Sequence, residues 1–162
     1  YDNTNMTNGT YLTEGSLLDV TTSGGTITQG WYFTLANNEK ALASADIFNK
    51  VVFFTTFTPT GDAVCGSGGG DAKLYAVQMT SGFAALDWSN DAEPYTTTTA
   101  SNPRGTVIGT GIASTPRVTL TDQGTTLSVF TVVGTTSQQL PATPAPPPDF
   151  MRRILYWREM MP

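Results

Sequence analysis

Histidine is absent from the 162-residue sequence, and cysteine occurs only once, as Cys65. Histidine is the usual acid–base group near neutral pH and the commonest protein ligand of zinc and copper. A chain without it lacks the side chain on which most nucleophilic and acid–base catalysis depends. We therefore expect a protein that is not an enzyme, with no catalytic, cofactor-binding or metal-binding residues and no cofactor.

Charged residues are also scarce, at 13% of the sequence, and long apolar runs are missing. Thirteen acidic and eight basic residues leave a net charge of −5. A general nucleic-acid binder needs many Lys and Arg residues to displace counterions from phosphates. No apolar run approaches the roughly 20 residues of a membrane-spanning helix. The sequence therefore predicts neither a nucleic-acid partner nor a membrane span.

Thr, Ser, Asn and Gly fill the positions where Lys and Glu usually stand. Thr favours strands and tolerates solvent, so this composition predicts an all-β protein with exposed strand faces. It is also typical of secreted surface proteins, which favours an extracellular location. The chain begins at Tyr1 and shows no signal peptide, so we expect a processed or excised product.

Several apolar runs read as strands. The most apolar run, residues 51–57, is β-branched and aromatic and is apolar on both faces, which predicts a central strand. Residues 31–35 form a dense aromatic strand, and residues 118–120 and 127–133 form a hairpin. Residues 39–46 fit either a helix or a strand.

The segment 73–88 combines a short apolar strand, a Thr-Ser-Gly turn and a second apolar run that ends in Trp88. This is the pattern of one edge of a β-propeller blade. A blade buries its apolar faces only against neighbouring blades. At ~40–45 residues per blade, the chain holds about three to four blades. We therefore predict a portion of a β-propeller that is incomplete alone, with a β-sandwich-like domain as the alternative.

The chain divides into four parts within one structural domain. Residues 1–29 form a polar N-terminal segment, and residues 30–140 carry the propeller-like strands. Residues 141–149 are rich in proline and predict a stiff, extended connector. Residues 150–162 have an apolar centre and predict a C-terminal strand that docks onto a sheet.

The glycine-rich loop 61–71 lacks the Gly-Lys-Ser/Thr of a phosphate loop, and its acids lack the spacing of a calcium loop. We interpret it as a solvated surface loop. Its Cys65 has no histidine to activate it. A disulfide to a segment outside this sequence, a free exposed thiol and a buried inert thiol remain open for Cys65, and the cross-link is our leading interpretation.

Aromatic residues are the last candidates for a functional site. They lie within strand patterns, so we expect core anchors and not a carbohydrate-binding platform. The residues that we assign to this structural role are Trp31, Phe54, Tyr75 and Trp157.

Segments spread over residues 30–160 resemble, in the same order, the C-terminal region of the PilY family, the tip-associated adhesins and assembly factors of type IV pili. The most specific are Gly-Trp-Tyr-Phe-Thr-Leu at 30–35, Val-Val-Phe-Phe-Thr-Thr-Phe-Thr-Pro at 51–59 and Arg-Ile-Leu-Tyr-Trp-Arg-Glu at 153–159. Between them stand Glu-Lys-Ala-Leu at 39–42, Cys-Gly at 65–66, Leu-Tyr-Ala-Val at 74–77 and Gly-Ile-Ala-Ser-Thr-Pro at 111–116.

The resemblance implies a quinoprotein-like propeller at the bacterial cell surface, involved in pilus assembly, adhesion and twitching motility. The expected partners are pilins, the remainder of a longer PilY-like protein, or further copies of this chain. Two features of the family are missing: the large N-terminal region that usually holds the adhesive module, and an Asp-rich calcium loop. We therefore assign no calcium site.

These observations leave three functional hypotheses. The first is a non-enzymatic scaffold and interaction module of a PilY-like adhesin, a fimbrial surface protein. The second is a structural subunit or pilin-companion domain of an extracellular filament, which would lend strands to its neighbours. The third, a quinone- or metal-dependent dehydrogenase, is disfavoured by the missing histidines.

Overall fold

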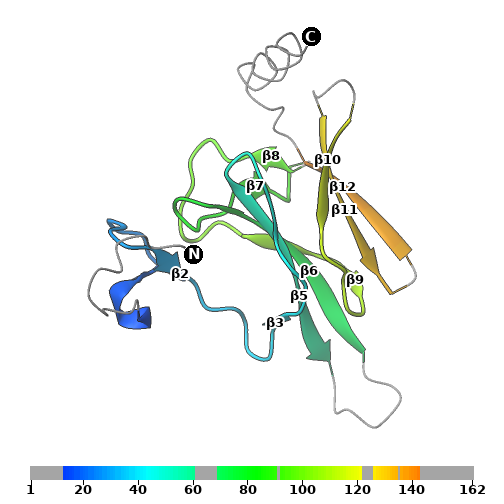
Figure 1. The fold of residues 1–162 in the computed structure, drawn as a ribbon, viewed down its shortest axis with the longest axis horizontal. Helices are drawn as coiled ribbons and strands as arrows, with labels where there is room; N and C mark the ends of the chain where they lie inside the picture. Colours follow the sequence, from blue (N-terminus) through cyan, green and yellow to red (C-terminus); the bar gives the residue numbers. More distant parts are fainter. Residues whose placement is uncertain (1–12, 61–68, 91, 122–125, 135, 143–162) are drawn as a thin grey trace, which may run out of the picture.

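The computed structural model describes residues 13–60, 69–90, 92–121, 126–134 and 136–142. Figure 1 shows two β-sheets side by side, with a short N-terminal segment beside the larger one. All strand pairings except that of β1 (Leu18–Asp19) with β2 (Trp31–Tyr32) are antiparallel in the described part. One short 3-10 helix, η1 (Glu14–Ser16), precedes them. The predicted all-β class is confirmed.

The central sheet is built around a long hairpin of β5 (Val51–Thr60) and β6 (Gly69–Gln78), which pair along ten residues each. β9 (Gly105–Thr110) pairs with the other edge of β6. β3 (Lys40–Ala41) and β4 (Asp46–Phe48) both pair with β5. The prediction of a central strand at residues 51–57 is therefore confirmed, and the segment 39–46 forms short strands.

The second sheet contains β10 (Arg117–Thr121), β11 (Thr126–Val133) and β12 (Thr136–Ala142) in that order. The predicted hairpin of β10 and β11 is confirmed. Strand β12 runs two residues into the predicted connector, because Pro141 pairs with Ser128. Proline is tolerated on an edge strand, where its missing N–H leaves no donor unpaired. The rest of the connector lies outside the described residues.

The core lies between one face of the central sheet and the second sheet. Phe53 and Leu74 from the central sheet and Val129 from the second sheet have no exposed surface. A small hairpin of β7 (Leu86–Asp87) and β8 (Glu93–Pro94) covers one end of this core through the buried Leu86. We call the face of the central sheet that meets this core the first face.

Buried hydroxyl groups within the same layer are paired. The hydroxyls of Thr55 and Thr131 donate hydrogen bonds to the Ser114 carbonyl oxygen at 3.0 Å and 3.1 Å. Because Thr55 belongs to β5 and Thr131 to β11, one carbonyl joins the two sheets. Each threonine is 2% exposed, so these bonds prevent the cost of a buried unpaired hydroxyl.

The opposite, second face of the central sheet carries Phe54, Thr56, Lys73 and Tyr75. Successive side chains of a strand point to opposite faces, so Phe53 enters the core and Phe54 leaves it. Phe54 is half-buried, whereas Tyr75 is 9% exposed.

Trp31 precedes the central hairpin and is also half-buried. Trp31 and Phe54 therefore lie outside the core formed with the second sheet, which corrects their expected role as core anchors. The expectation rests on their position within apolar strand patterns, and such a pattern does not say which face of a sheet is covered. Cys65 and Trp157 lie outside the described residues.

The glycine-rich loop is shorter than predicted, because β6 already begins at Gly69. A Cβ atom on Gly70 would lie 2.4 Å from the Phe57 ring. This close approach of the two strands explains a glycine inside a strand, where it otherwise lowers stability. The residues 61–68 lie outside the described part.

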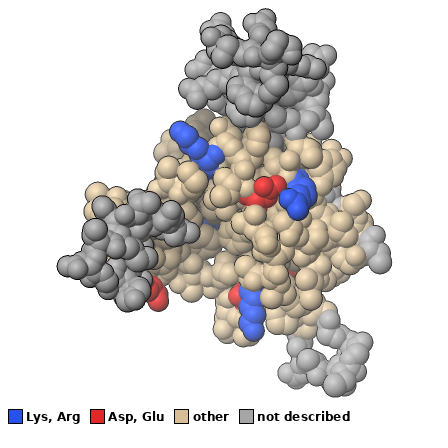
Figure 2. All heavy atoms as spheres, viewed as in Figure 1, with Lys and Arg blue, Asp and Glu red and all other residues tan. Residues whose placement is uncertain are grey.

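Figure 2 shows few charged side chains on the visible face, as the composition requires. Two antiparallel sheets that share one core agree with the all-β prediction. The described strands form neither a closed barrel nor a closed propeller. The assignment of these sheets to propeller blades therefore stays a prediction.

The adjacent residues Phe53 and Phe54 test the two-face arrangement. We expect Phe53→Ala to lower the free energy of unfolding by about 3–5 kcal/mol, because it leaves a cavity in the core. Phe54→Ala should cost clearly less, since that ring is half-exposed in the isolated chain. Urea denaturation of the two variants measures both values, and equal losses would contradict the arrangement.

Candidate functional site

A buried carboxylate organises the second face of the central sheet. Glu39 stands at the end of a tight turn in which its N–H donates to the Ala36 carbonyl at 3.0 Å. Asn38 in this turn has a φ of 62°, in the left-handed region that asparagine tolerates better than most residues. The turn directs the Glu39 side chain onto the sheet.

Four partners surround the Glu39 carboxylate. Its Oε1 accepts hydrogen bonds from the hydroxyls of Thr56 at 2.5 Å and Tyr75 at 2.8 Å. Its Oε2 accepts the Ala36 N–H at 3.1 Å and lies 3.7 Å from Lys73 Nζ. Because Thr56 pairs with Lys73 across β5 and β6, these groups emerge side by side on one face.

Burial by itself raises the pKa of Glu39, but the hydrogen bonds from Thr56, Tyr75 and Ala36 and the Lys73 charge outweigh it, so the pKa is lowered overall. Burial, and then the bond to Glu39, raise the pKa of Tyr75. At neutral pH, Glu39 is therefore a charged acceptor and Tyr75 a donor. The described contacts of this carboxylate join the turn at Ala36 to strands β5 and β6, and their role is structural.

An aromatic stack extends across the second face from this cluster. The rings of Phe54 and Tyr75 are stacked with centroids 4.8 Å apart, and Phe33 lies 6.0 Å from Tyr75. Trp31 stacks on Phe33 at 6.2 Å. Such offset ring pairs stabilise a fold by about 0.5–1.5 kcal/mol beyond the area they bury.

Trp31 is held at its outer end by the turn that follows β6. Its indole N–H donates to the Met79 carbonyl at 2.9 Å. A Cβ atom on Gly82 would lie 2.4 Å from the Trp31 ring, and Gly82 has a φ of 68°. Both the ring contact and the backbone conformation therefore require glycine. This is the Thr-Ser-Gly turn of the sequence pattern.

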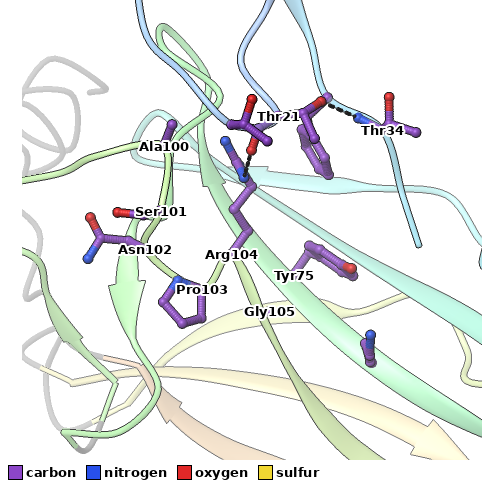
Figure 3. A pocket seen from close by; sticks show the side chains of 12 residues that line it. Thr21, Thr34, Tyr75, Ala100, Ser101, Asn102, Pro103, Arg104 and Gly105 are labelled. Carbon is purple, nitrogen blue, oxygen red and sulfur yellow. Dashed lines mark hydrogen bonds between the residues drawn. The ribbon is translucent and has the colours of Figure 1, made fainter.

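Arg104 fastens the N-terminal segment to this face. Its guanidinium lies 4.9 Å from the centroid of the Phe33 ring, a cation–π contact. Its Nε donates to the Gly82 carbonyl at 2.7 Å, and its two Nη atoms donate to the carbonyls of Thr21, at 3.4 Å, and Val20. Figure 3 shows the Arg104 side chain reaching from its loop toward Thr21. One side chain thus joins three segments.

Two hollows flank this arrangement. The first, the polar pocket, has a volume of about 430 Å³ and lies between the loop 100–105, the N-terminal segment and the second face (Figure 3). The second, the aromatic groove, has a volume of about 330 Å³. Phe33 lines both. The other groove residues are Trp31, Tyr32, Leu35 and Phe54.

The structure brings three of the sequence-predicted residues together. Trp31 and Phe54 line the aromatic groove, and Tyr75 lines the polar pocket. Sequence reasoning missed Glu39 and Arg104. Their charge was the only feature of the sequence that could have pointed to them, because charged residues are scarce in this chain.

The pH dependence of stability tests the role of Glu39. We expect Glu39→Gln to lower the free energy of unfolding at pH 7 by about 1–3 kcal/mol, because a charge-assisted network is lost. A lowered folded-state pKa stabilises above the unfolded value of about 4.3, and this contribution disappears as pH falls through the folded value.

The gap between wild type and Glu39→Gln should therefore shrink between about pH 5 and pH 3. Urea denaturation across that range measures it. Glu14→Gln, at an exposed position, is the matched control and should change little. A gap that stays constant with pH would contradict an ionised, stabilising Glu39.

The geometry of Arg104 can be tested with a substitution that keeps its charge. We expect Arg104→Lys to cost about 1–3 kcal/mol, because a lysine cannot form the planar fork that reaches several carbonyls and stacks on a ring. Arg117→Lys, exposed on the second sheet, should be near neutral. Equal Tm values for the two variants would show that Arg104 acts only through its charge.

In the described part of the chain, no three His, Cys, Asp or Glu residues come close enough to hold a metal ion. None of its helices has the length and apolar character needed to cross a membrane. Comparisons with protein-family models, curated proteins and solved structures found no match for the chain.

Proposed function

We propose that this chain is a non-enzymatic interaction module of a bacterial surface protein, namely the C-terminal propeller region of a PilY-like adhesin at the tip of type IV pili. In this role it acts outside the cell in pilus assembly, adhesion and twitching motility. The observation that carries the proposal is the aromatic groove on the second face of the central sheet.

The two faces of the central sheet are covered to different extents. The first face is closed by the second sheet, and its Phe53 and Leu74 have no exposed surface. In the aromatic groove, by contrast, Trp31, Tyr32 and Phe54 all remain half-buried. Aromatic residues concentrate at protein–protein interfaces, where Trp and Tyr contribute much of the binding energy. We therefore expect another protein surface to bind in this groove and to bury these rings.

The strand order supports the propeller assignment. In both sheets the antiparallel neighbours keep the order of the chain: β10, β11 and β12 in one, and β5, β6 and β9 in the other, where the separate β7–β8 hairpin is inserted between β6 and β9. A propeller blade is such a small antiparallel sheet, packed face to face with the next blade. We assign the two sheets to consecutive blades, and the groove to the contact with the preceding blade of a longer polypeptide.

The site chemistry favours binding over catalysis. The buried carboxylate of Glu39 already accepts three hydrogen bonds and faces Lys73. A general base needs a free lone pair directed at a substrate proton. The Tyr75 hydroxyl is likewise committed to Glu39.

The second candidate is a subunit or companion domain of an extracellular filament. Among the described strands, β12 pairs with β11 alone, so its other edge presents backbone groups to a neighbour. An unpaired edge of this kind can accept a strand from another chain. Electron microscopy that shows ordered polymers of the purified chain would favour this function over the adhesin module.

A genetic experiment in the source bacterium tests the adhesin proposal. We expect deletion of the encoding gene to abolish twitching motility and to reduce the number of surface pili, and the wild-type gene to restore both. Leu35→Asp should fail to restore them, because it places a charge in the aromatic groove. Pilus counts by electron microscopy and twitching zones measure the outcome.

Leu42→Asp is the matched control, because Leu42 is 55% exposed and does not line the groove. It should complement fully. Thermal unfolding of both purified variants establishes that they fold. Normal pili and twitching in the deletion strain would overturn the pilus assignment, and full complementation by Leu35→Asp would overturn the role of the groove.

A further inference from the structure

The polar pocket differs from the aromatic groove in the chemistry of its walls. Two cations, Lys73 and Arg104, line it, and no acidic side chain does. Its other polar groups are hydroxyls and an amide: Thr21, Thr22, Thr34, Ser101 and Asn102. We infer that this pocket binds a sugar that carries a carboxylate, such as a uronic or sialic acid unit. The inference concerns this chain whether or not it belongs to a pilus.

Lys73 is the group best placed to meet the carboxylate. Its side chain is 30% exposed, so a ligand can reach it. Its one described ionic contact, with Glu39, is long at 3.7 Å. An ammonium group has three donors, so donors remain for a ligand. A charge-assisted hydrogen bond of this kind is stronger than one between neutral groups.

Arg104 adds a second positive charge to the lining of the pocket. Its hydrogen bonds end on the backbone carbonyls of Gly82, Thr21 and Val20, which carry no formal charge. No carboxylate forms an ion pair with Arg104 in the described part of the chain. Its charge is therefore not cancelled by direct contact.

Two nearby acids lower the negative charge that the pocket favours in a ligand. Glu39 lies beneath Lys73, and the exposed Asp19 acts on Arg104 from a greater distance. Their oxygens have their own donors, the Thr21 N–H at 2.8 Å in the case of Asp19. These two acids reduce the positive potential of the pocket without cancelling it, which suits a monoanion such as a carboxylate better than a phosphate dianion.

The remaining walls suit hydroxyl groups. Serine and threonine hydroxyls both donate and accept, and so match the hydroxyls of a sugar. The loop that supplies part of them is ordered by its own bonds, since Asn102 Oδ1 accepts the Thr99 N–H at 2.6 Å and the Thr99 hydroxyl at 2.8 Å. The volume of about 430 Å³ falls in the range of small-molecule sites.

An aromatic ligand fits less well, because the rings at the pocket already have partners. Arg104 covers Phe33, and Phe54 stacks on Tyr75. These rings therefore shape the wall of the pocket, and their faces are not free to stack on a ligand. Recognition rests on the cations and the hydroxyls.

Titration of the purified 162-residue chain, followed by ¹H–¹⁵N NMR, tests the inference. The probes are D-galacturonate, its neutral counterpart D-galactose, and acetate. We expect galacturonate to shift the amide signals of Thr34, Lys73 and Gly105 and to bind at least tenfold more tightly than either of the other two. Galactose lacks the carboxylate, and acetate lacks the hydroxyls.

Two variants place the ligand in the pocket. Lys73→Gln should weaken galacturonate binding at least tenfold, while Arg117→Gln, which removes an exposed cation on the second sheet, should not. Asn102→Asp keeps the acceptor oxygen for Thr99 and adds a negative charge to the wall. It should also weaken binding at least tenfold, whereas Asn49→Asp, at an exposed turn, should leave it unchanged.

Each alternative result is decisive. Equal affinity for galactose would show that the carboxylate is not recognised, and equal affinity for acetate would show general anion binding. The absence of shifts at tens of millimolar galacturonate, or full binding by Asn102→Asp, would also overturn the inference. If Lys73→Gln unfolds, Asn102→Asp still tests the pocket. The titration does not depend on any pilus phenotype, so its failure is separate from failure of the proposed function.

Discussion

The ten-residue pairing of β5 with β6 is the constraint on which the rest of the structure depends. It fixes in one register which side chains enter the core and which form the second face. Phe53 and Leu74 go to the core, and Thr56 and Lys73 go to the other side. A shift of one residue would exchange the two sets and place the Lys73 ammonium in the apolar core. The tight approach at Gly70 helps to hold the register.

Two charges of this chain, Glu39 and Lys73, meet where the register brings polar side chains together. Glu39 is buried, which is costly for a carboxylate unless donors and a cation compensate it. The paired strands supply these from Thr56, Tyr75 and Lys73. The same arrangement leaves part of Lys73 facing the polar pocket. A structural ion pair and a binding site therefore share one side chain.

Local patterns in the sequence predicted the longer strands but not the site, and of the strand predicted at residues 31–35 only Trp31–Tyr32 forms. The apolar run of β5 and the β10–β11 hairpin could be predicted because their signals lie within a few residues. The two hydroxyls that donate to Glu39 are 17 and 36 positions away, and the partners of Arg104 as many as 84. Such contacts depend on how separate segments pack, which no local pattern encodes. The same limit explains the placement of Trp31 and Phe54, whose hydrophobicity predicts burial without naming the surface that buries them.

Phe33 is shared by the two hollows of the second face, because it lines both. A partner in the aromatic groove would contact this ring, and Arg104 rests on it at 4.9 Å. Coupling between the hollows nevertheless requires that the ring have two arrangements, each favoured by one ligand. Phe33 is packed against Tyr75 and under Arg104, and Arg104 itself is fixed by three carbonyls. A ring held on these sides has little freedom to move, so the groove and the pocket should bind independently.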